Sequence, residues 1–168
     1  AYKHSLEAFL FCCYTGLRYS DFGHLSDKNI VFIDKEPWLV FTTIKTGAEV
    51  RLPLTLLFEG KAWKLLRKHQ KHLEEFFCIK ANSTVNKELI RIGKLAGIQK
   101  HFSFHSARHT NATLLIYKGV NITTVQKLLG HRNVSTIQIY SEVMGSTIVN
   151  DLKKYSKGKK RGLNRERH

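Results

Sequence analysis

The chain has few cysteines, no long apolar run and few acidic residues, and each shortage narrows the class of protein. Its three cysteines are Cys12, Cys13 and Cys78, an odd number that includes two sequence neighbours. This pattern fits neither a disulfide framework nor the ligand spacing of a zinc site, so we expect reduced, buried thiols. No segment reaches the ~20 apolar residues that cross a bilayer, because the apolar run Leu6–Tyr14 is short and contains Glu7. We therefore expect a cytoplasmic protein with no membrane partner.

Basic residues outnumber acidic residues by 28 to 13, which gives the chain a formal net charge of +15. An excess of this size favours an anionic polymer as the partner. Charge alone leaves DNA, RNA and an acidic membrane surface as alternatives. Part of the excess lies in a C-terminal run that follows Asp151 and contains a single acid, Glu166. The basic residues of this run are Lys153, Lys154, Lys157, Lys159, Lys160, Arg161, Arg165 and Arg167.

The length and the apolar content predict one folded domain followed by a tail. Of the 168 residues, 42% are hydrophobic, and they include ten Phe, six Tyr and two Trp, which is enough to bury a core. We place the domain at residues 1–155. Residues 156–168 are typical of a disordered basic tail, because a run of like charges repels itself and stays solvated.

The chain opens with a predicted helix that ends at Gly16. Its apolar face, at helical spacing, comprises Leu6, Phe9, Leu10 and Cys13. A short helical turn is expected after Arg18, with Ser20 and Asp21 as candidate caps. Asp21 is also a candidate partner that holds Arg18.

The segment between residues 29 and 53 is rich in β-forming residues. Three such runs, separated by turn-forming residues, predict a small three-stranded antiparallel sheet. The runs are Ile30–Ile33, Trp38–Thr43 and Glu49–Leu52. Lys45 lies in the second turn.

The remainder of the chain is predicted to be helical, so the expected fold class is α+β and mainly helical. Ser83 is a candidate N-cap, and Gly97, Gly119 and Gly130 are candidate helix ends. The predicted helices cover residues 54–72, 84–96, 105–118 and 122–129, a segment that opens at 135 and carries Tyr140, and a last amphipathic segment at about 142–155.

The predicted elements contain arginine, lysine and histidine side chains that could approach one tyrosine. His105 and Arg108 are three residues apart, so on a helix their Cβ atoms lie about 5–6 Å apart on one face. His131 follows a helix-ending glycine, and Tyr140 comes nine positions later. Arg18 can reach the same place only through tertiary folding. A phenol that meets two arginines, two histidines and a lysine at one phosphate suggests a nucleophile for phosphoryl transfer.

The residues that carry this chemistry lie in short motifs with a family resemblance. The motifs are Thr-Gly-Leu-Arg-Tyr-Ser-Asp at 15–21, Lys45 in the meander, Phe-His-Ser-Ala-Arg-His-Thr at 104–110, and Leu-Gly-His at 129–131 leading to Tyr140. In order and separation they resemble the signature boxes of the tyrosine recombinases, the phage-integrase family. The resemblance implies a mostly helical catalytic domain with a small sheet, which cleaves and rejoins double-stranded DNA without a metal or nucleotide cofactor. It also implies an amino-terminal DNA-clamping domain outside this sequence, and a nucleoid-associated protein of a bacterium or phage.

The resemblance and the chemistry of a phosphodiester give each group a role. Arg18 and Arg108 would stabilise charge on the non-bridging oxygens. His105 and His131 would donate to those oxygens or move the phenol proton. Lys45 would protonate the leaving 5′ oxygen, and Tyr140 would form a 3′-phosphotyrosyl ester. The candidate catalytic residues are therefore Arg18, Lys45, His105, Arg108, His131 and Tyr140.

Other readings of these residues stay open. The rival functions are a type IB topoisomerase, which shares the phosphotyrosine chemistry, and a DNA-binding module without catalysis. His109 is a candidate for support of its neighbours. A metal site is not expected at His69 and His72, because no Cys or carboxylate joins them at ligand spacing. The segment at 142–155 either docks on a neighbouring subunit, as in a tetramer on DNA, or folds back on its own core.

Overall fold

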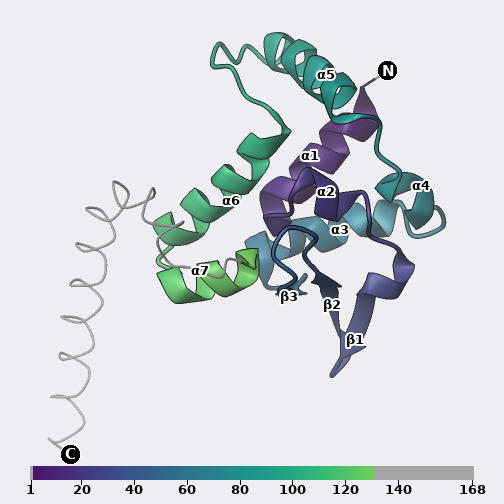
Figure 1. Cartoon of the computed structure of the whole chain (residues 1–168), viewed down its shortest axis with the longest axis vertical. Coiled ribbons are helices and arrows are strands. Elements are labelled where there is room, and N and C mark those ends of the chain that lie inside the picture. The colour runs from purple at the N-terminus through teal and green to yellow at the C-terminus, as the bar shows by residue number, and fades with distance from the viewer. Residues whose placement is uncertain (1, 131–168) are drawn as a thin grey trace, which may run out of the picture.

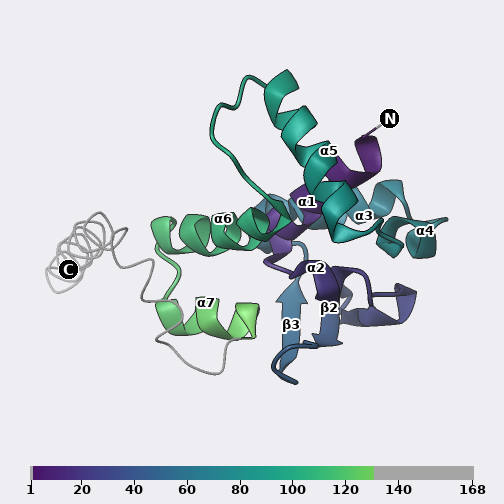
Figure 2. The same ribbon diagram turned by 45° about the horizontal axis from the view of Figure 1, so that its top comes forward.

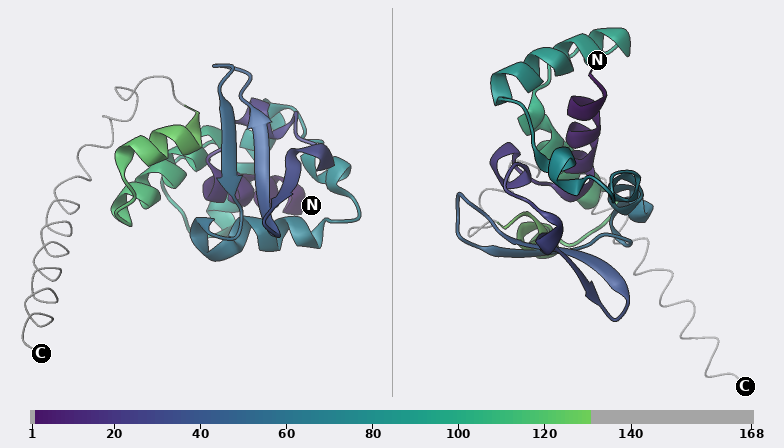
Figure 3. Two further views of the ribbon diagram at one scale, coloured as in Figure 1. Left: turned by 90° about the horizontal axis from the view of Figure 1, so that it is seen from below. Right: turned by 90° about the vertical axis from the view of Figure 1, so that its right-hand side faces the viewer.

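Helices surround one central helix, and a small sheet lies on one side of them (Figures 1 and 3). The computed structural model describes residues 2–130. The helices are α1 (Lys3–Thr15), α2 (Tyr19–Phe22), α3 (Lys61–Lys68), α4 (Leu73–Phe77), α5 (Asn82–Leu95), α6 (Phe104–Tyr117) and α7 (Ile122–Leu129), with 3₁₀ turns η1 (Asp27–Asn29) and η2 (Leu57–Gly60). The strands are β1 (Ile30–Ile33), β2 (Glu36–Thr42) and β3 (Glu49–Pro53). The predicted fold class, mainly helical with a three-stranded antiparallel sheet, is confirmed.

The central helix is α1, which contacts α3, α4, α5 and α6. Neighbours on several sides bury it around most of its circumference. Its fully or nearly fully buried residues are Ser5, Glu7, Ala8, Phe11, Cys12, Cys13 and Thr15. The predicted face was therefore only partly right: Cys13 is buried, but Leu6, Phe9 and Leu10 are only half-buried. The predicted end at Gly16 is confirmed, with a left-handed backbone at that residue.

A cluster of phenylalanines fixes the turn from α1 into α2. The ring of Phe11 on α1 lies 5.9 Å from that of Phe22 on α2 and 5.7 Å from that of Phe76 on α4. Phe77 lies 5.4 Å from Phe22. All four rings are 0–1% exposed, and edge-to-face pairs of this kind each add about 0.5–1.5 kcal/mol beyond the burial of area. The cluster thereby holds the α1–α2 junction, where Arg18 lies.

The sheet is a meander with the order β1-β2-β3. Its first turn is shorter than predicted, because Asp34 and Lys35 both take positive φ (51° and 67°) and close a two-residue hairpin. Glu36 then pairs with Ile33, and β2 starts two residues earlier than expected. The second turn, residues 43–48, carries Lys45 as predicted. On the outer edge, β1 exposes Phe32 to 62%.

The helix predicted over residues 54–72 forms only in part, as α3 (Lys61–Lys68). Phe58 and Glu59 have left-handed φ values of 48° and 59°, so the chain turns at η2 before α3 begins. The side chain of Phe58 is buried by this turn, which shows that tertiary packing overrides the local helical pattern. After α3, His69 stacks on Phe76 at 4.5 Å and binds Glu7, with 3.0 Å between Nε2 and Oε2. The unpredicted helix α4 follows.

Two predicted caps are also wrong. Helix α2 has Arg18 as its N-cap and no side-chain cap, so neither Ser20 nor Asp21 fills that role. Helix α5 begins after Ala81 rather than at Ser83. In the rest of the described chain, α6 and α7 match the predicted helices within one residue at each end.

The cysteines divide into two environments. Cys12 and Cys13 are buried and free, as expected. Burial raises the pKa of Cys13 to about 12 and raises that of Cys12 above its ordinary value, so both are poor nucleophiles. Cys78 is exposed, which contradicts the expectation of three buried thiols. Within residues 2–130, no helix has the length and apolar content needed to cross a membrane.

Gly16 should be costly to replace. Its φ is 75°, and a Cβ there would lie 2.8 Å from the Asn111 Oδ1 atom and against Leu129. Gly97 is a matched control, because its φ is 71° and a Cβ would meet nothing within 4 Å. We expect Gly97→Ala to lower the free energy of unfolding by about 1–2 kcal/mol, and Gly16→Ala by roughly 1–3 kcal/mol more. Urea unfolding measures both, and equal losses would contradict the close packing at Gly16.

Candidate active site

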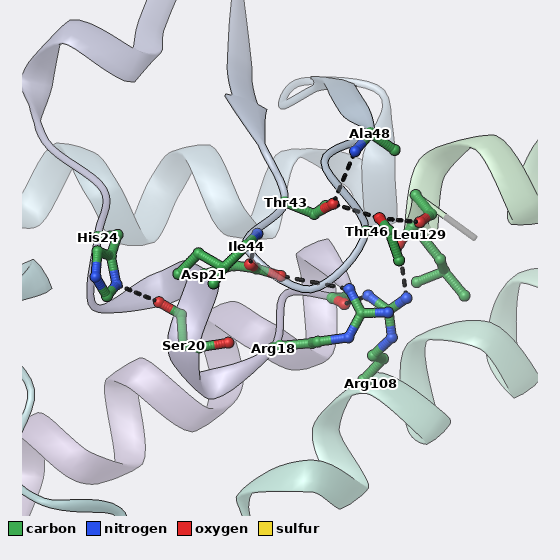
Figure 4. Close-up of polar contacts among 12 residues, drawn as sticks. Arg18, Ser20, Asp21, His24, Thr43, Ile44, Thr46, Ala48, Arg108 and Leu129 are labelled. Carbon is green, nitrogen blue, oxygen red and sulfur yellow. Dashed lines mark hydrogen bonds and ion pairs between the residues drawn. The ribbon is translucent and has the colours of Figure 1, made fainter. Parts of the chain in front are cut away.

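Arg108 is the buried centre of the site. It projects from α6 and is 6% exposed. Its Nη1 donates to the Gly16 carbonyl (2.7 Å). Its Nη2 donates to the Leu129 carbonyl (2.6 Å), and Figure 4 shows Arg108 beside Leu129. A buried guanidinium must be hydrogen-bonded to be tolerated, and these bonds also fix the plane of the group. One cation is thus held rigidly between the ends of α1 and α7.

Arg18 lies beside Arg108 at the start of α2 (Figure 4). Its Nη1 is 3.5 Å from Oδ2 of Asp21, whose side chain is 0% exposed. Neither of these two buried atoms has a hydrogen bond among residues 2–130. The predicted pairing of Asp21 with Arg18 is confirmed as an ion pair. Two guanidinium groups side by side repel each other, so an anion placed between them would be stabilised by both.

Lys45 stands in the turn between β2 and β3, and this turn is attached to the rest of the site on both sides of the lysine. On one side, the backbone N–H of Ile44 donates to Oδ1 of Asp21 (3.0 Å). On the other, the Thr46 hydroxyl donates to the Gly130 carbonyl (3.0 Å). The side chain of Lys45 itself is exposed. The turn therefore presents a solvent-accessible ammonium from a fixed backbone.

The end of α7 packs closely on this hairpin (Figure 2). Gly130, the left-handed C-cap of α7, has a φ of 63°. A Cβ there would lie 2.7 Å from Cγ2 of Val50 and 2.9 Å from Cγ2 of Thr43. Only glycine allows this approach together with the left-handed backbone.

His105 lies in the first turn of α6, near enough to the cations for their charges to act on it. Partial desolvation lowers its pKa below the ordinary value, and the charges of nearby groups lower it further. In decreasing order these groups are His109, Arg108, Arg18 and Lys45. The rings of His105 and His109 meet edge to face at 4.6 Å. His105 is nevertheless exposed to solvent, and the neutral imidazole is favoured there at neutral pH.

Four of the six candidate catalytic residues therefore meet in one cluster: Arg18, Lys45, His105 and Arg108. They come from α2, the β2–β3 turn and α6, and all three cations act on His105. His131 and Tyr140 lie outside the described residues. Sequence reasoning missed Thr43 and Thr46, whose hydroxyls are 2.5 Å apart. Their position within two residues of Lys45 was the available signal.

The described chain offers no obvious metal site. Across residues 2–130, no group of three or more His, Cys, Asp or Glu side chains is arranged to hold a metal ion. The charged groups near Arg108 include Arg18 and Lys45, against the carboxylate of Asp21 that pairs with Arg18, and this net positive charge attracts anions instead.

Comparison with known proteins identifies the family. The family model described as "Phage integrase family" matches residues 1–145, a span that includes His131 and Tyr140. The chain belongs to the phage integrase family. A tyrosine recombinase of Pseudothermotoga lettingae is 35% identical over 144 residues, which cover 83% of this chain and 48% of the relative. Tyrosine recombinase XerA of Saccharolobus solfataricus is 33% identical over 140 residues, or 82% and 45% of the two chains.

Solved structures of this family share the fold. A lambda integrase dimer bound to a COC′ core site superposes with a TM-score of 0.66 at 23% identity, covering 82% of this chain and 52% of the other. The crystal structure of XerA recombinase gives 0.64 at 21% identity, covering 91% and 63%. The chain spans about half the length of the curated relatives that it matches.

The electrostatic coupling within the cluster can be measured at His105. Lys45→Gln removes one of the charges that lower the His105 pKa, so this pKa should rise part of the way toward its ordinary value. Lys35→Gln, in the other hairpin turn, is the matched control and should leave the pKa unchanged. NMR titration of the His105 ring protons, assigned with His105→Asn, gives the values. A His105 pKa that does not respond to Lys45→Gln would separate the lysine from the cluster.

Proposed function

We propose that the chain is the catalytic domain of a site-specific DNA recombinase, which cleaves and rejoins DNA strands through a 3′-phosphotyrosyl ester on Tyr140. The observation that carries the proposal is the convergence of Arg18, Arg108, His105 and Lys45 on one site, in which Arg108 is buried and Lys45 and His105 are exposed. Membership of the phage integrase family supports the same conclusion. Relatives that match most of the chain are named tyrosine recombinases.

The two arginines suit the transition state of phosphoryl transfer. Attack on a phosphodiester gathers negative charge on the non-bridging oxygens, and fixed cations there contribute several kcal/mol. Arg108 is held by the Gly16 and Leu129 carbonyls, so little reorganisation is needed when the charge develops. Nη1 of Arg18 is buried against Asp21, but the side chain as a whole is 15% exposed beside Arg108, so its other N–H groups can meet an oxygen of the phosphate.

The remaining groups handle protons. His105, with its lowered pKa, is mostly neutral at pH 7 and can accept or donate one hydrogen bond at the phosphate. His131 assists Tyr140 as the phenol proton leaves. Lys45 protonates the 5′ oxygen as it departs, because its exposed ammonium can reach out from the turn. The phosphotyrosyl ester conserves the bond energy, so rejoining requires no external energy source and no cofactor.

The partner is double-stranded DNA, and a net charge of +15 favours it. Related solved structures include recombinases on DNA, among them a lambda integrase dimer on a core site and XerH on a difH substrate. We assign residues 1–155 to the catalytic domain and 156–168 to a basic tail that contacts DNA backbone. The segment 142–155 joins neighbouring subunits in a tetramer on DNA. An amino-terminal clamping domain completes the grip on the duplex.

A type IB topoisomerase would use the same ester, and a binding module would use the same charge. The histidine at position 131 before the tyrosine favours the recombinase over the topoisomerase. The paired arginines favour an enzyme over a binder, because surface lysines suffice for contacts to phosphate.

A suicide substrate separates an enzyme from a binder. Incubation with nicked duplex should give a covalent protein–DNA product that survives denaturation. Tyr140→Phe should abolish this product, a loss of at least ~10³-fold, and leave the mobility shift nearly unchanged because one hydroxyl is removed. Tyr117→Phe is the control, since Tyr117 is 60% exposed at the end of α6. A persistent adduct in Tyr140→Phe would assign the nucleophile to another residue, and a shift without any adduct would make the protein a binder.

Leaving-group chemistry tests the role of Lys45. Lys45→Ala should slow cleavage of ordinary DNA by about 10²–10⁴-fold, because the 5′ oxygen loses its acid. DNA with a bridging 5′ sulfur needs no such proton, so its cleavage should be largely restored. Arg18→Lys keeps a cation beside Asp21 but loses the forked geometry, and it should be slow on both substrates. Equal defects of Lys45→Ala on the two substrates would remove Lys45 from the acid role.

A further inference from the structure

The turn that carries Lys45 is fastened by a relay of two hydroxyls. Thr43 is 2% exposed, and its Oγ1 lies 2.5 Å from Oγ1 of Thr46. Oγ1 of Thr43 also accepts from the backbone N–H of Ala48 (3.2 Å). The Thr46 hydroxyl donates to the Gly130 carbonyl (3.0 Å), across 84 residues of sequence. Figure 4 shows this relay running from the hairpin to the end of α7.

The direction of the relay follows from the acceptors. A hydroxyl has one hydrogen to donate. Because Thr46 gives its hydrogen to the Gly130 carbonyl, the Thr43 hydroxyl donates to Thr46 and still accepts from Ala48. Each hydroxyl is then satisfied, and each bond strengthens its neighbour.

We propose that Thr46 is a positioning residue for Lys45, holding the turn against the carbonyl of the residue that precedes His131. The inference rests on the proposed function, in which Lys45 is the acid. Lys45 is exposed and flexible, so its own side chain gives it no fixed place. Its backbone is placed by its two neighbours, through Ile44 to Asp21 and through Thr46 to Gly130.

The hydrogen bond from Thr46 to Gly130, called the tie below, ends next to a hydrogen bond of Arg108, the cation proposed to bind the phosphate. Arg108 donates to the carbonyl of Leu129, and Thr46 donates to that of Gly130. Two adjacent carbonyls at the end of α7 therefore accept these bonds, one from Arg108 and the other from the turn that contains Lys45. Loss of the Thr46 hydroxyl would leave Arg108 in place and release only the turn.

Hydrogen exchange tests the tie independently of any activity. Thr46→Val keeps the shape and removes the donor, so the amides of residues 44–48 should exchange faster, by roughly 5–30-fold. Thr46→Ser keeps the hydroxyl and should stay near wild type. Thr42→Val is the matched control, since Thr42 is exposed on the same hairpin and has no side-chain hydrogen bond among the described residues. Unchanged exchange in Thr46→Val would overturn the tie itself.

Cleavage of ordinary and 5′-sulfur DNA then tests whether the Thr46–Gly130 hydrogen bond positions Lys45. Thr46→Val should slow cleavage of ordinary DNA by roughly 5–30-fold and recover on the sulfur substrate. In a Lys45→Ala background it should add no further loss, because the group that it positions is gone. An equal defect on both substrates would overturn the proposal, since Thr46 would then act through the segment after Gly130. The Lys45→Ala single variant tests the acid role separately. If its cleavage of the 5′-sulfur substrate is not restored, the proposed acid role of Lys45 is wrong, whereas hydrogen exchange still decides whether the tie exists.

Discussion

The hydrogen bonds from Arg108 to two backbone carbonyls are the constraint on which the site depends. One side chain on α6 joins the end of α1, at Gly16, to the end of α7, at Leu129. A guanidinium buried in this way tolerates no loss of partners, because an unpaired buried charge costs several kcal/mol. Both helix ends are thereby held in register with α6. The Arg18 junction, the Lys45 turn and the start of the segment with His131 all adjoin these two ends.

The same region concentrates positive charge that the fold alone does not need. Arg18 and Arg108 lie together, and Asp21 supplies one buried carboxylate against them. Such a cluster lowers the stability of the free protein, because like charges repel, and strengthens binding of an anion. Functional sites commonly lose stability in this way. The lowered pKa of His105 is a local sign of this field. The phenylalanine cluster around Phe11 and the rest of the core offset the cost.

The elements that sequence reasoning found are those with local signals. Gly16 and Gly130 end their helices as expected, and Lys45 lies in the second turn of a three-stranded meander. The failures have tertiary causes: Phe58 leaves the helical region so that its ring can be buried, and Asp21 accepts from Ile44 instead of capping α2. Four candidate catalytic residues do meet, but the ties that hold them, such as that from Thr46 to Gly130, join residues far apart in the sequence. No local pattern encodes a partner 84 residues away.

That distance has a consequence for the order of folding. The bond from Arg108 to Gly16 spans 92 residues and that from Thr46 to Gly130 spans 84. Forming contacts of such long range costs the conformational entropy of closing large loops. We therefore expect them to form late, after α1 and the hairpins have folded. A chain still emerging from the ribosome, or caught part-way through folding, carries its basic residues without their common geometry. The assembled cluster of Arg18, Lys45, His105 and Arg108 and the completed fold therefore arise in the same step.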